Sequence, residues 1–323
     1  MPSPEFVQSI RELDRQLGEG FLQLPPLSVT KQHLTSLGRL IQLGNTDIND
    51  LKHWLQHRSI AACDGSRLEF GPFFPHTVVL QRAMAIVSQH QDTVTEISCC
   101  TPLIPSVSLE IEEMARHKTV SPAEVYPRWL QRKLAALEVK VAAQAIEQWQ
   151  PRLMLMDGGL LLFDTLPGWN DLLAAAARAD TLVAGVIEEI ATAELAPRLH
   201  INRRPVYDRE LLFGLLEPGE VLILDKDKPI KKEYRTVFTR FSTRPAAAAC
   251  DFLPGTSEND IIQCIKLLYA ATGSTGRGVP FLLDLVDRKV RLTHQEGEVI
   301  LKMGLSNDTY EKLFTSQRQQ RNI

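Results

Sequence analysis

The chain has 323 residues, of which 44% are hydrophobic and 23% charged, proportions that are ordinary for a soluble globular protein of one or two domains. Its 36 basic and 39 acidic side chains leave a formal net charge of -3. This balance excludes a global positive field that draws the chain to nucleic acid, so any such contact needs a local basic groove. The sequence shows no apolar run of transmembrane length and no signal peptide at its start, so we expect no membrane span.

The five cysteines are odd in number and lack the spacing of a zinc site. Three of them lie in apolar surroundings that are typical of buried thiols, and the other two, Cys99 and Cys100, are adjacent in sequence. A pattern without evident disulfide pairs favours a reducing compartment. We therefore expect a cytoplasmic protein.

The N-terminal stretch has the spacing of helices. Apolar residues recur at helical intervals from Phe6 to Leu17, and two further helices are predicted over residues 29–43 and 48–57. Nothing in this stretch indicates chemistry. We expect a helical arm over residues 1–57 that packs either on the rest of the chain or on a second copy.

From residue 59 the pattern changes to strands. Residues 59–63, 77–87 and 92–103 predict three strands joined by turns, which together indicate an antiparallel meander. Buried strands then alternate with helices, as in an α/β layered fold. The remaining expected elements are helices at 108–118 and 121–149, a strand at 152–156, a helix at 170–179, a strand at 181–187, a helix at 208–216, strands at 221–224 and 234–241, a helix at 258–271, a strand at 281–286 and closing helices at 297–314.

Two of the predicted strands end in the same dipeptide. Each apolar run is followed by an Asp-Gly pair, which begins at Asp64 in one case and at Asp157 in the other. Chemistry in α/β sheets lies just past the carboxyl ends of strands, so the two aspartates could converge on one metal ion. The alternative is structural, because Asp-Gly is also a common hairpin turn in which glycine takes a positive φ.

The long predicted helix carries a candidate third carboxylate. Glu138 shares a face with Leu134 and Val141, and the helix leads directly into the strand before Asp157; Glu147 competes because it is nearer that strand. Mg²⁺ and Mn²⁺ prefer oxygen ligands, and two such ions about 3.5–4 Å apart can stabilise the attacking and leaving oxygens of a phosphodiester cleavage. The alternative is a solvated glutamate, which is the commoner case on a helix.

These motifs resemble those of the NurA nucleases, whose core is RNase H-like. The order and spacing hold from roughly residue 59 to 300 and rest on Asp64-Gly65-Ser66, Asp157-Gly158-Gly159, the helical Glu138, the strand at 182–187 and Gly278-Val279-Pro280. The resemblance implies an α/β fold with an RNase H-like mixed sheet flanked by helices. It also implies a nuclease domain over residues 58–315, between the N-terminal helical arm and a frayed tail at 316–323.

By that resemblance, the catalytic and metal-binding carboxylates are Asp64, Glu138 and Asp157. The family usually places a histidine after its last strand, and Asp287 stands there in this sequence, so the resemblance implies that Asp287 takes that ligand's role. The implied cofactor is Mn²⁺ or Mg²⁺, bound as two ions.

The resemblance further implies a deoxyribonuclease, either a 5′–3′ exonuclease or a single-strand endonuclease or both, that processes double-strand break ends. The implied partners are DNA, a HerA-type hexameric ATPase and a second copy in a homodimer. Two positions depart from the family, which often has tyrosine where Val279 stands and lysine where Glu188 stands. A catalytically weakened subunit that binds DNA or regulates an ATPase partner therefore remains an alternative.

Two features away from these motifs bear on function. Asp225 and Asp227 suggest a phosphatase of the haloacid dehalogenase type, although the surrounding lysines and Pro229 favour a charged hairpin turn. A second group consists of basic residues that could line a DNA path, although a solvated charged face is the commoner role for any one of them. These are Arg203, Arg204, Lys231, Lys232, Arg235, Arg240 and Arg244.

Overall fold

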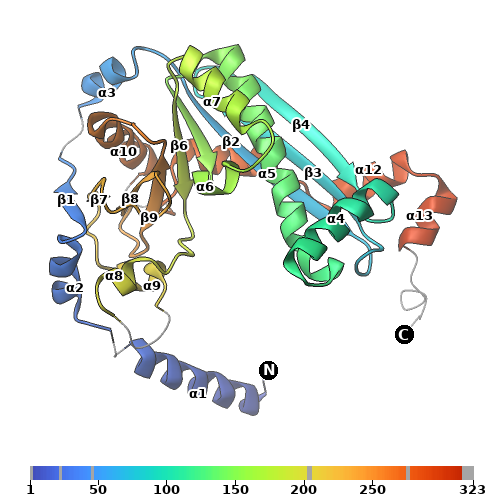
Figure 1. Ribbon diagram of the computed structural model, residues 1–323, viewed down its shortest axis with the longest axis horizontal. Helices are drawn as coiled ribbons and strands as arrows, with labels where there is room; N and C mark the ends of the chain where they lie inside the picture. The colour runs from blue at the N-terminus through green and yellow to red at the C-terminus, as the bar shows by residue number, and fades with distance from the viewer. Residues whose placement is uncertain (1–2, 22–23, 45–46, 202–205, 274–276, 315–323) are drawn as a thin grey trace. The chain divides into compact units, whose positions relative to one another are not determined.

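The chain forms two compact units, each assembled from two separate stretches of sequence. The first unit comprises Met1–Asp47 and Val186–Pro280, and the second comprises Ile48–Gly185 and Phe281–Ile323. The computed structural model (Figure 1) describes residues 3–21, 24–44, 47–201, 206–273 and 277–314. The tail expected to fray, at 316–323, lies outside these ranges.

The second unit is a mixed sheet with the strand order β6-β5-β2-β3-β4. In this sheet β2 pairs antiparallel with β3, β3 pairs antiparallel with β4, and β2 pairs parallel with β5. The strands are β2 (Ile60–Phe70), β3 (Val78–Val87), β4 (Thr93–Cys100), β5 (Leu153–Asp157) and β6 (Leu182–Ile187), whose last two residues belong to the other unit. The predicted meander and the mixed α/β sheet flanked by helices are confirmed.

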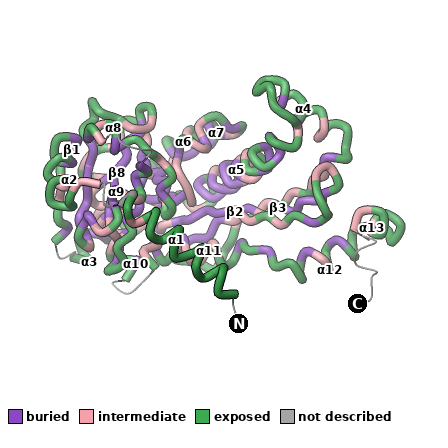
Figure 2. The backbone as a smooth tube through the Cα atoms, turned by 90° about the horizontal axis from the view of Figure 1, so that it is seen from below, coloured by how far each residue is buried: buried purple, intermediate pink, exposed green. Residues whose placement is uncertain are grey.

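Helices surround this sheet. The longest of them, α5, begins at a capping box in which Ser121 and Glu124 satisfy each other's backbone N–H groups, and its middle is buried (Figure 2). The helices of the second unit are α3 (Ile48–Trp54), α4 (Pro105–Lys118), α5 (Pro122–Trp149), α6 (Leu160–Phe163), α7 (Trp169–Arg178), α11 (Phe281–Val290), α12 (His294–Gly304) and α13 (Asn307–Phe314).

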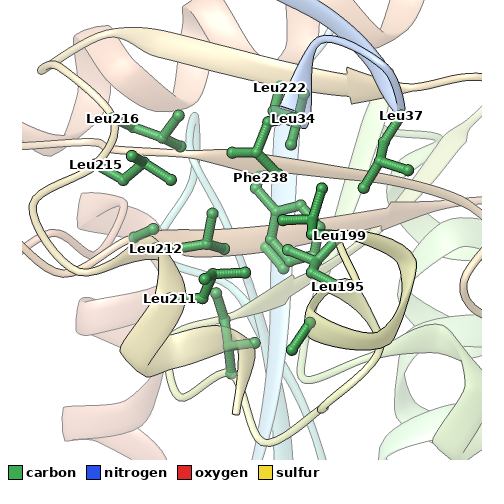
Figure 3. Close-up of a cluster of buried hydrophobic side chains, with 14 of the residues drawn as sticks. Leu34, Leu37, Leu195, Leu199, Leu211, Leu212, Leu215, Leu216, Leu222 and Phe238 are labelled. Atoms are coloured by element: carbon green, nitrogen blue, oxygen red, sulfur yellow. The ribbon is translucent and has the colours of Figure 1, made fainter. Parts of the chain in front are cut away.

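The first unit is built on four antiparallel strands in the order β1-β7-β8-β9. Its core is a leucine-rich cluster that short helices and strands share, with Phe238 at its centre (Figure 3). The elements of this unit are α1 (Pro4–Phe21), α2 (Leu27–Leu34), β1 (Gly38–Gln42), α8 (Leu195–Arg198), α9 (Asp208–Leu212), β7 (Glu220–Leu224), β8 (Arg235–Thr239), β9 (Ala248–Phe252) and α10 (Glu258–Thr272).

The structure corrects two sequence predictions and adds one strand that the sequence did not predict. The helix expected over 29–43 ends at Leu34, and β1 follows because it pairs with β7, with Gly38 opposite Leu224. The strand expected at 281–286 is part of helix α11, whose buried residues Leu283, Val286 and Val290 recur at helical spacing. A short apolar run does not distinguish a strand from a buried helix. Strand β9 was not predicted at all.

The expected first strand is also longer than predicted. It does not end at the Asp-Gly pair but continues from Ile60 through Gly65 to Phe70, and Gly65 pairs with Ala83 of β3. The hairpin-turn alternative for Asp64 is therefore wrong. By contrast, the second pair does end a strand, since β5 stops at Asp157 and Gly158 takes a φ of +110°.

Candidate metal centre

The centre is built on two neighbouring parallel strands. Cys63 of β2 lies opposite Met156 of β5, so one residue further along both strands Asp64 comes beside Asp157. Residues in register on parallel strands project from the same face, and neighbouring strands lie about 4.8 Å apart. The strand pairing thus brings together two carboxylates that are 93 positions apart in the sequence.

Glu138 approaches the pair from helix α5, on the other face of β2. The alternation of β2 places Cys63 and Gly65 toward this helix, and the Cys63 thiol donates to the Glu138 carbonyl oxygen at 3.4 Å. A Cβ on Gly65 would overlap Glu138 Oε1 and would lie 2.8 Å from Leu134 Cδ1. The missing side chain of Gly65 is therefore what lets Glu138 lie against the strand. Glu138 is 8% exposed.

Asp287 comes from helix α11, which packs against β2 and β3. Its carboxylate pairs with Arg291 at 2.9 Å, and its charge raises the pKa of both Asp64 and Asp157. Asp287 therefore lies in the same cluster. It reaches the cluster from a helix and not, as the sequence suggested, from the end of a last strand.

The C-terminal end of α11 is anchored to the sheet by side chains that the sequence did not single out. Arg82 on β3 donates from Nε to the Val290 carbonyl oxygen at 2.8 Å and from Nη2 to that of Arg291 at 2.7 Å. Ser66 Oγ on β2 accepts the Leu292 N–H at 3.2 Å. An arginine at the negative end of a helix is favourable, but nothing in the local sequence around Arg82 predicted this role.

The pKa values of three carboxyl groups in the cluster, those of Asp64, Glu138 and Asp157, are raised. Burial raises the pKa of Asp64 to about 7, with the charge of Asp157 adding to the effect, while the Gly65 N–H bonded to Oδ1 at 2.6 Å opposes it. Burial, and then the charges of Asp64 and Asp157, raise the pKa of Glu138 to about 8. Burial and the charge of Asp287 also raise the pKa of Asp157. Like charges gathered in a poorly hydrated place produce this pattern.

Comparison with known proteins agrees with this geometry. The family described as NurA domain matches residues 58–292. The chain belongs to the NurA family. No curated protein sequence matches it.

The fold of this NurA-family chain is similar to solved NurA structures. The NurA nuclease from Sulfolobus solfataricus aligns with a TM-score of 0.56 and 14% identity over 97% of this chain and 99% of that one. A structure of NurA with manganese gives 0.55 and 12%, covering 93% of this chain and 99% of that one. NurA bound to dAMP and manganese gives 0.55 and 11%, covering 94% and 98%. At these identities the likeness shows the fold.

The donor set of this NurA-family chain fits a divalent cation that prefers oxygen. The charge of Asp287 raises the pKa of Asp64 and Asp157, and the charges of Asp64 and Asp157 raise that of Glu138. A bound dication would offset this repulsion. Among the described residues, however, no three His, Cys, Asp or Glu side chains are arranged as a finished metal site. Hydrogen bonding between the Asp64 and Asp157 side chains contributes to the raised pKa of Asp64 and acts to lower that of Asp157.

Several other candidates have different roles. Glu147 is a surface residue paired with Arg178 at 2.8 Å, so it does not compete with Glu138. Asp225 and Asp227 lie in the turn between the antiparallel strands β7 and β8, which confirms the charged hairpin.

The predicted basic path is only partly available. Lys231 is bound to the fully buried Asp251, with Nζ 2.9 Å from Oδ1. Arg240 donates to the backbone carbonyls of Leu216, Ser242, Thr243 and Arg244. Arg203 and Arg204 lie outside the described residues.

No described helix is both long and apolar enough to cross a bilayer.

Proposed function

We propose that this chain is a metal-dependent nuclease whose centre is formed by Asp64, Glu138, Asp157 and Asp287. The observation that carries the proposal is that these four carboxylates, from β2, α5, β5 and α11, interact electrostatically, and that the pKa values of Asp64, Glu138 and Asp157 are raised. Buried carboxylates are costly unless a cation compensates them. A structural role would be served better by apolar side chains.

Manganese, or magnesium in its place, is the proposed cofactor, and two ions are the proposed number. Solved structures of NurA with manganese, and of NurA with dAMP and manganese, support this choice. When bound, such ions activate water and stabilise charge on the oxygens of a phosphodiester. The chain's own contribution is to hold the carboxylates: strand pairing aligns Asp64 with Asp157, and Gly65 leaves room for Glu138.

The proposed substrate is DNA, cut as a 5′–3′ exonuclease, a single-strand endonuclease or both, during double-strand break end processing. Family membership supports this assignment. On the same ground we propose a homodimer that works beside a HerA-type hexameric ATPase in the cytoplasm. We also propose that residues 58–315 act as the nuclease domain and that the stretch up to residue 57 is an arm.

The second candidate is a weakened family member that binds DNA or regulates an ATPase without cutting. Two observations favour it. The carboxylates do not form a finished metal site among the described residues, and Val279 and Glu188 depart from the residues that the family resemblance leads one to expect.

The deciding experiment incubates the purified chain with end-labelled linear DNA, with and without Mn²⁺, beside its Asp157→Asn variant. Cleavage that needs Mn²⁺ and is lost in the variant supports the nuclease. Equal cutting by the variant sinks the proposed centre. DNA binding by both proteins with cutting by neither supports the second candidate.

A phosphatase using Asp225 is tested separately. We expect no turnover of a chromogenic phosphomonoester, because this aspartate is an exposed turn residue whose side chain lies 3.6 Å from Lys228 Nζ. Turnover that disappears in Asp225→Ala would restore the phosphatase.

A further inference from the structure

Helix α1 carries an apolar face that stays exposed in the described part of the chain. Four large side chains form this face and are between 49% and 74% exposed: Phe6, Ile10, Leu13 and Leu17. We call these four side chains the α1 seam. Every residue from 3 to 17 is exposed (Figure 2). Because short helices are marginal in isolation and gain most of their stability by packing an apolar face, the α1 seam needs a partner from outside the described part of this chain.

The spacing of the α1 seam is that of a coiled coil. Its members are separated by four, three and four residues, which is the alternation of a and d positions in a heptad repeat. Ile10 and Leu17 occupy a positions, and Phe6 and Leu13 occupy d positions. A seam of this kind packs against another helix, so we expect the partner to be a helix.

The charges of α1 argue against two other kinds of partner. The helix carries four carboxylates and only two arginines. Helices that lie on a membrane surface are rich in lysine and arginine, and contacts with nucleic-acid phosphates are made by the same two residue types. The net negative charge of α1 fits neither role, and a protein helix remains as the partner.

The α1 seam is complementary to a second copy of itself when the two helices run antiparallel. With Ile10 of one copy opposite Leu13 of the other, a two-fold axis also sets Phe6 opposite Leu17. Each a position then meets a d position in all four layers of the pair. No polar side chain enters these layers, so the whole seam would be removed from water.

The charges beside the α1 seam favour the same register. Arg15 is held within its own helix by Glu12 and Glu19, but Arg11 and Asp14 have no ion-pair or hydrogen-bond partner within the described ranges. Both lie on one flank of the seam, and an antiparallel pair brings equal flanks together. Arg11 of one copy and Asp14 of the other are then offset by two residues, about 3 Å along the axis. A parallel pair would set opposite flanks together and would separate these charges.

We propose that α1 pairs antiparallel with α1 of a second copy of this chain through the α1 seam. This inference rests on the homodimer of the proposed function and names a surface that forms it. The two-fold axis gives two Arg11–Asp14 pairs at the rim of the interface. Of the two places that the sequence left open for the N-terminal arm, the second copy is the one that the exposed seam supports.

Sedimentation equilibrium of the full chain and of its Leu13→Asp and Leu27→Asp variants tests the α1 seam. Leu27 of α2 is the matched control, because it is a leucine of the same unit that is 53% exposed, against 49% for Leu13. We expect Leu13→Asp to raise the dimer dissociation constant at least about thirtyfold, since the two-fold axis places two carboxylates in an apolar interface. Leu27→Asp should leave the constant unchanged. Equal constants for the two variants overturn the proposal.

An exchange of charges between copies tests the direction of the helices. Arg11→Glu and Asp14→Arg each place like charges across an antiparallel interface, so each variant alone should dimerise more weakly than the unmodified chain. A mixture of the two variants restores opposite charges at both rim pairs. We expect the mixed dimer to be favoured about tenfold at low salt, and less at high salt. A statistical mixture of dimers overturns the antiparallel pairing, because an ion pair within one chain cannot be restored by mixing.

Mn²⁺-dependent hydrolysis of bis(4-nitrophenyl) phosphate distinguishes failure of the α1 pairing from failure of the nuclease. A chain that is monomeric at every concentration overturns the α1 pairing together with the homodimer, whereas hydrolysis by that monomer still supports the metal centre. A dimer that Leu13→Asp does not weaken overturns the α1 pairing alone.

Discussion

Gly65 of β2 and Glu138 of α5 are so close that a methyl group on the glycine would overlap the glutamate's Oε1. Gly65 lies inside a regular antiparallel strand pair, opposite Ala83, so no turn requires a glycine here. A glycine is required because a buried carboxylate comes so close to this position. This contact determines how near Glu138 can come to Asp64 on the neighbouring position of the strand.

Gly65→Ala is therefore expected to reduce Mn²⁺-dependent cleavage strongly and to destabilise the chain by about 1–3 kcal/mol, the usual cost of overpacking. Cleavage assays and chemical denaturation measure the two effects. Gly304→Ala is the control, because a Cβ at the end of α12 meets nothing within 4 Å. A Gly65→Ala protein that cuts normally would show that Glu138 is dispensable.

Asp64→Asn is expected to abolish cleavage and yet to stabilise the metal-free protein near neutral pH. The amide removes a buried charge that the folded state disfavours. The free energy of unfolding should therefore rise by on the order of 2–4 kcal/mol at pH values above the raised pKa of about 7. Thermal unfolding in EDTA measures it. Loss of stability in the variant would mean that the carboxylate has a structural role.

Stability without metal should fall as the pH rises. Asp64 and Glu138 have pKa values of about 7 and about 8 in the folded chain, above the unfolded values near 4. The folded state therefore binds more protons than the unfolded state between these limits. The stability that these two groups contribute is complete below about pH 4 and is lost as the pH rises through about 8. Mn²⁺ should raise the melting temperature more at about pH 8.5 than at about pH 6. An equal shift at both values contradicts metal binding by these carboxylates.

Arg82→Ala should weaken metal binding without touching a proposed ligand. The substitution leaves the carbonyl oxygens of Val290 and Arg291 unpaired at the end of α11, at a cost of about 1–3 kcal/mol. It also loosens the helix that carries Asp287. We expect a higher Mn²⁺ concentration for half-maximal cleavage, partly rescued by Arg82→Lys. Arg67→Ala, on the exposed side of β2, is the control; the same rise in both variants would exclude positioning through α11.

Lys231→Met tests the division between structural and DNA-binding cations. Asp251 is fully buried, and its carboxylate accepts hydrogen bonds from Lys231 Nζ and from Thr236 Oγ1, the latter at 2.8 Å from Oδ1. Removal of the lysine should cost about 3–5 kcal/mol, as for other broken buried pairs. Lys226→Met, in the exposed turn after β7, should change the free energy of unfolding by less than about 0.5 kcal/mol. Denaturant titration compares the two, and equal values would contradict a buried pair.

The sequence by itself determined the local elements whose signals lie within a few residues. The cap at Ser121 predicted α5, and the apolar, β-branched run of residues 77–87 predicted β3. The Asp-Gly pairs pointed to Asp64 and Asp157 because two apolar runs end in the same dipeptide. These features depend on short-range backbone and side-chain preferences, which a linear chain already contains.

Only the tertiary structure decided the rest. The apolar run of residues 281–286 is compatible with a strand and with a helix, and packing against β2 and β3 selects the helix that brings in Asp287. Likewise, β1 became a strand because β7 offers it hydrogen bonds, and Lys231 is drawn in from solvent because it pairs with the buried Asp251. The position of Asp64 beside Asp157 depends on the register of β2 and β5. The room for the Glu138 side chain depends on Gly65, and the raised pKa values depend on burial. Each arises between residues far apart in sequence, where local preference has no influence.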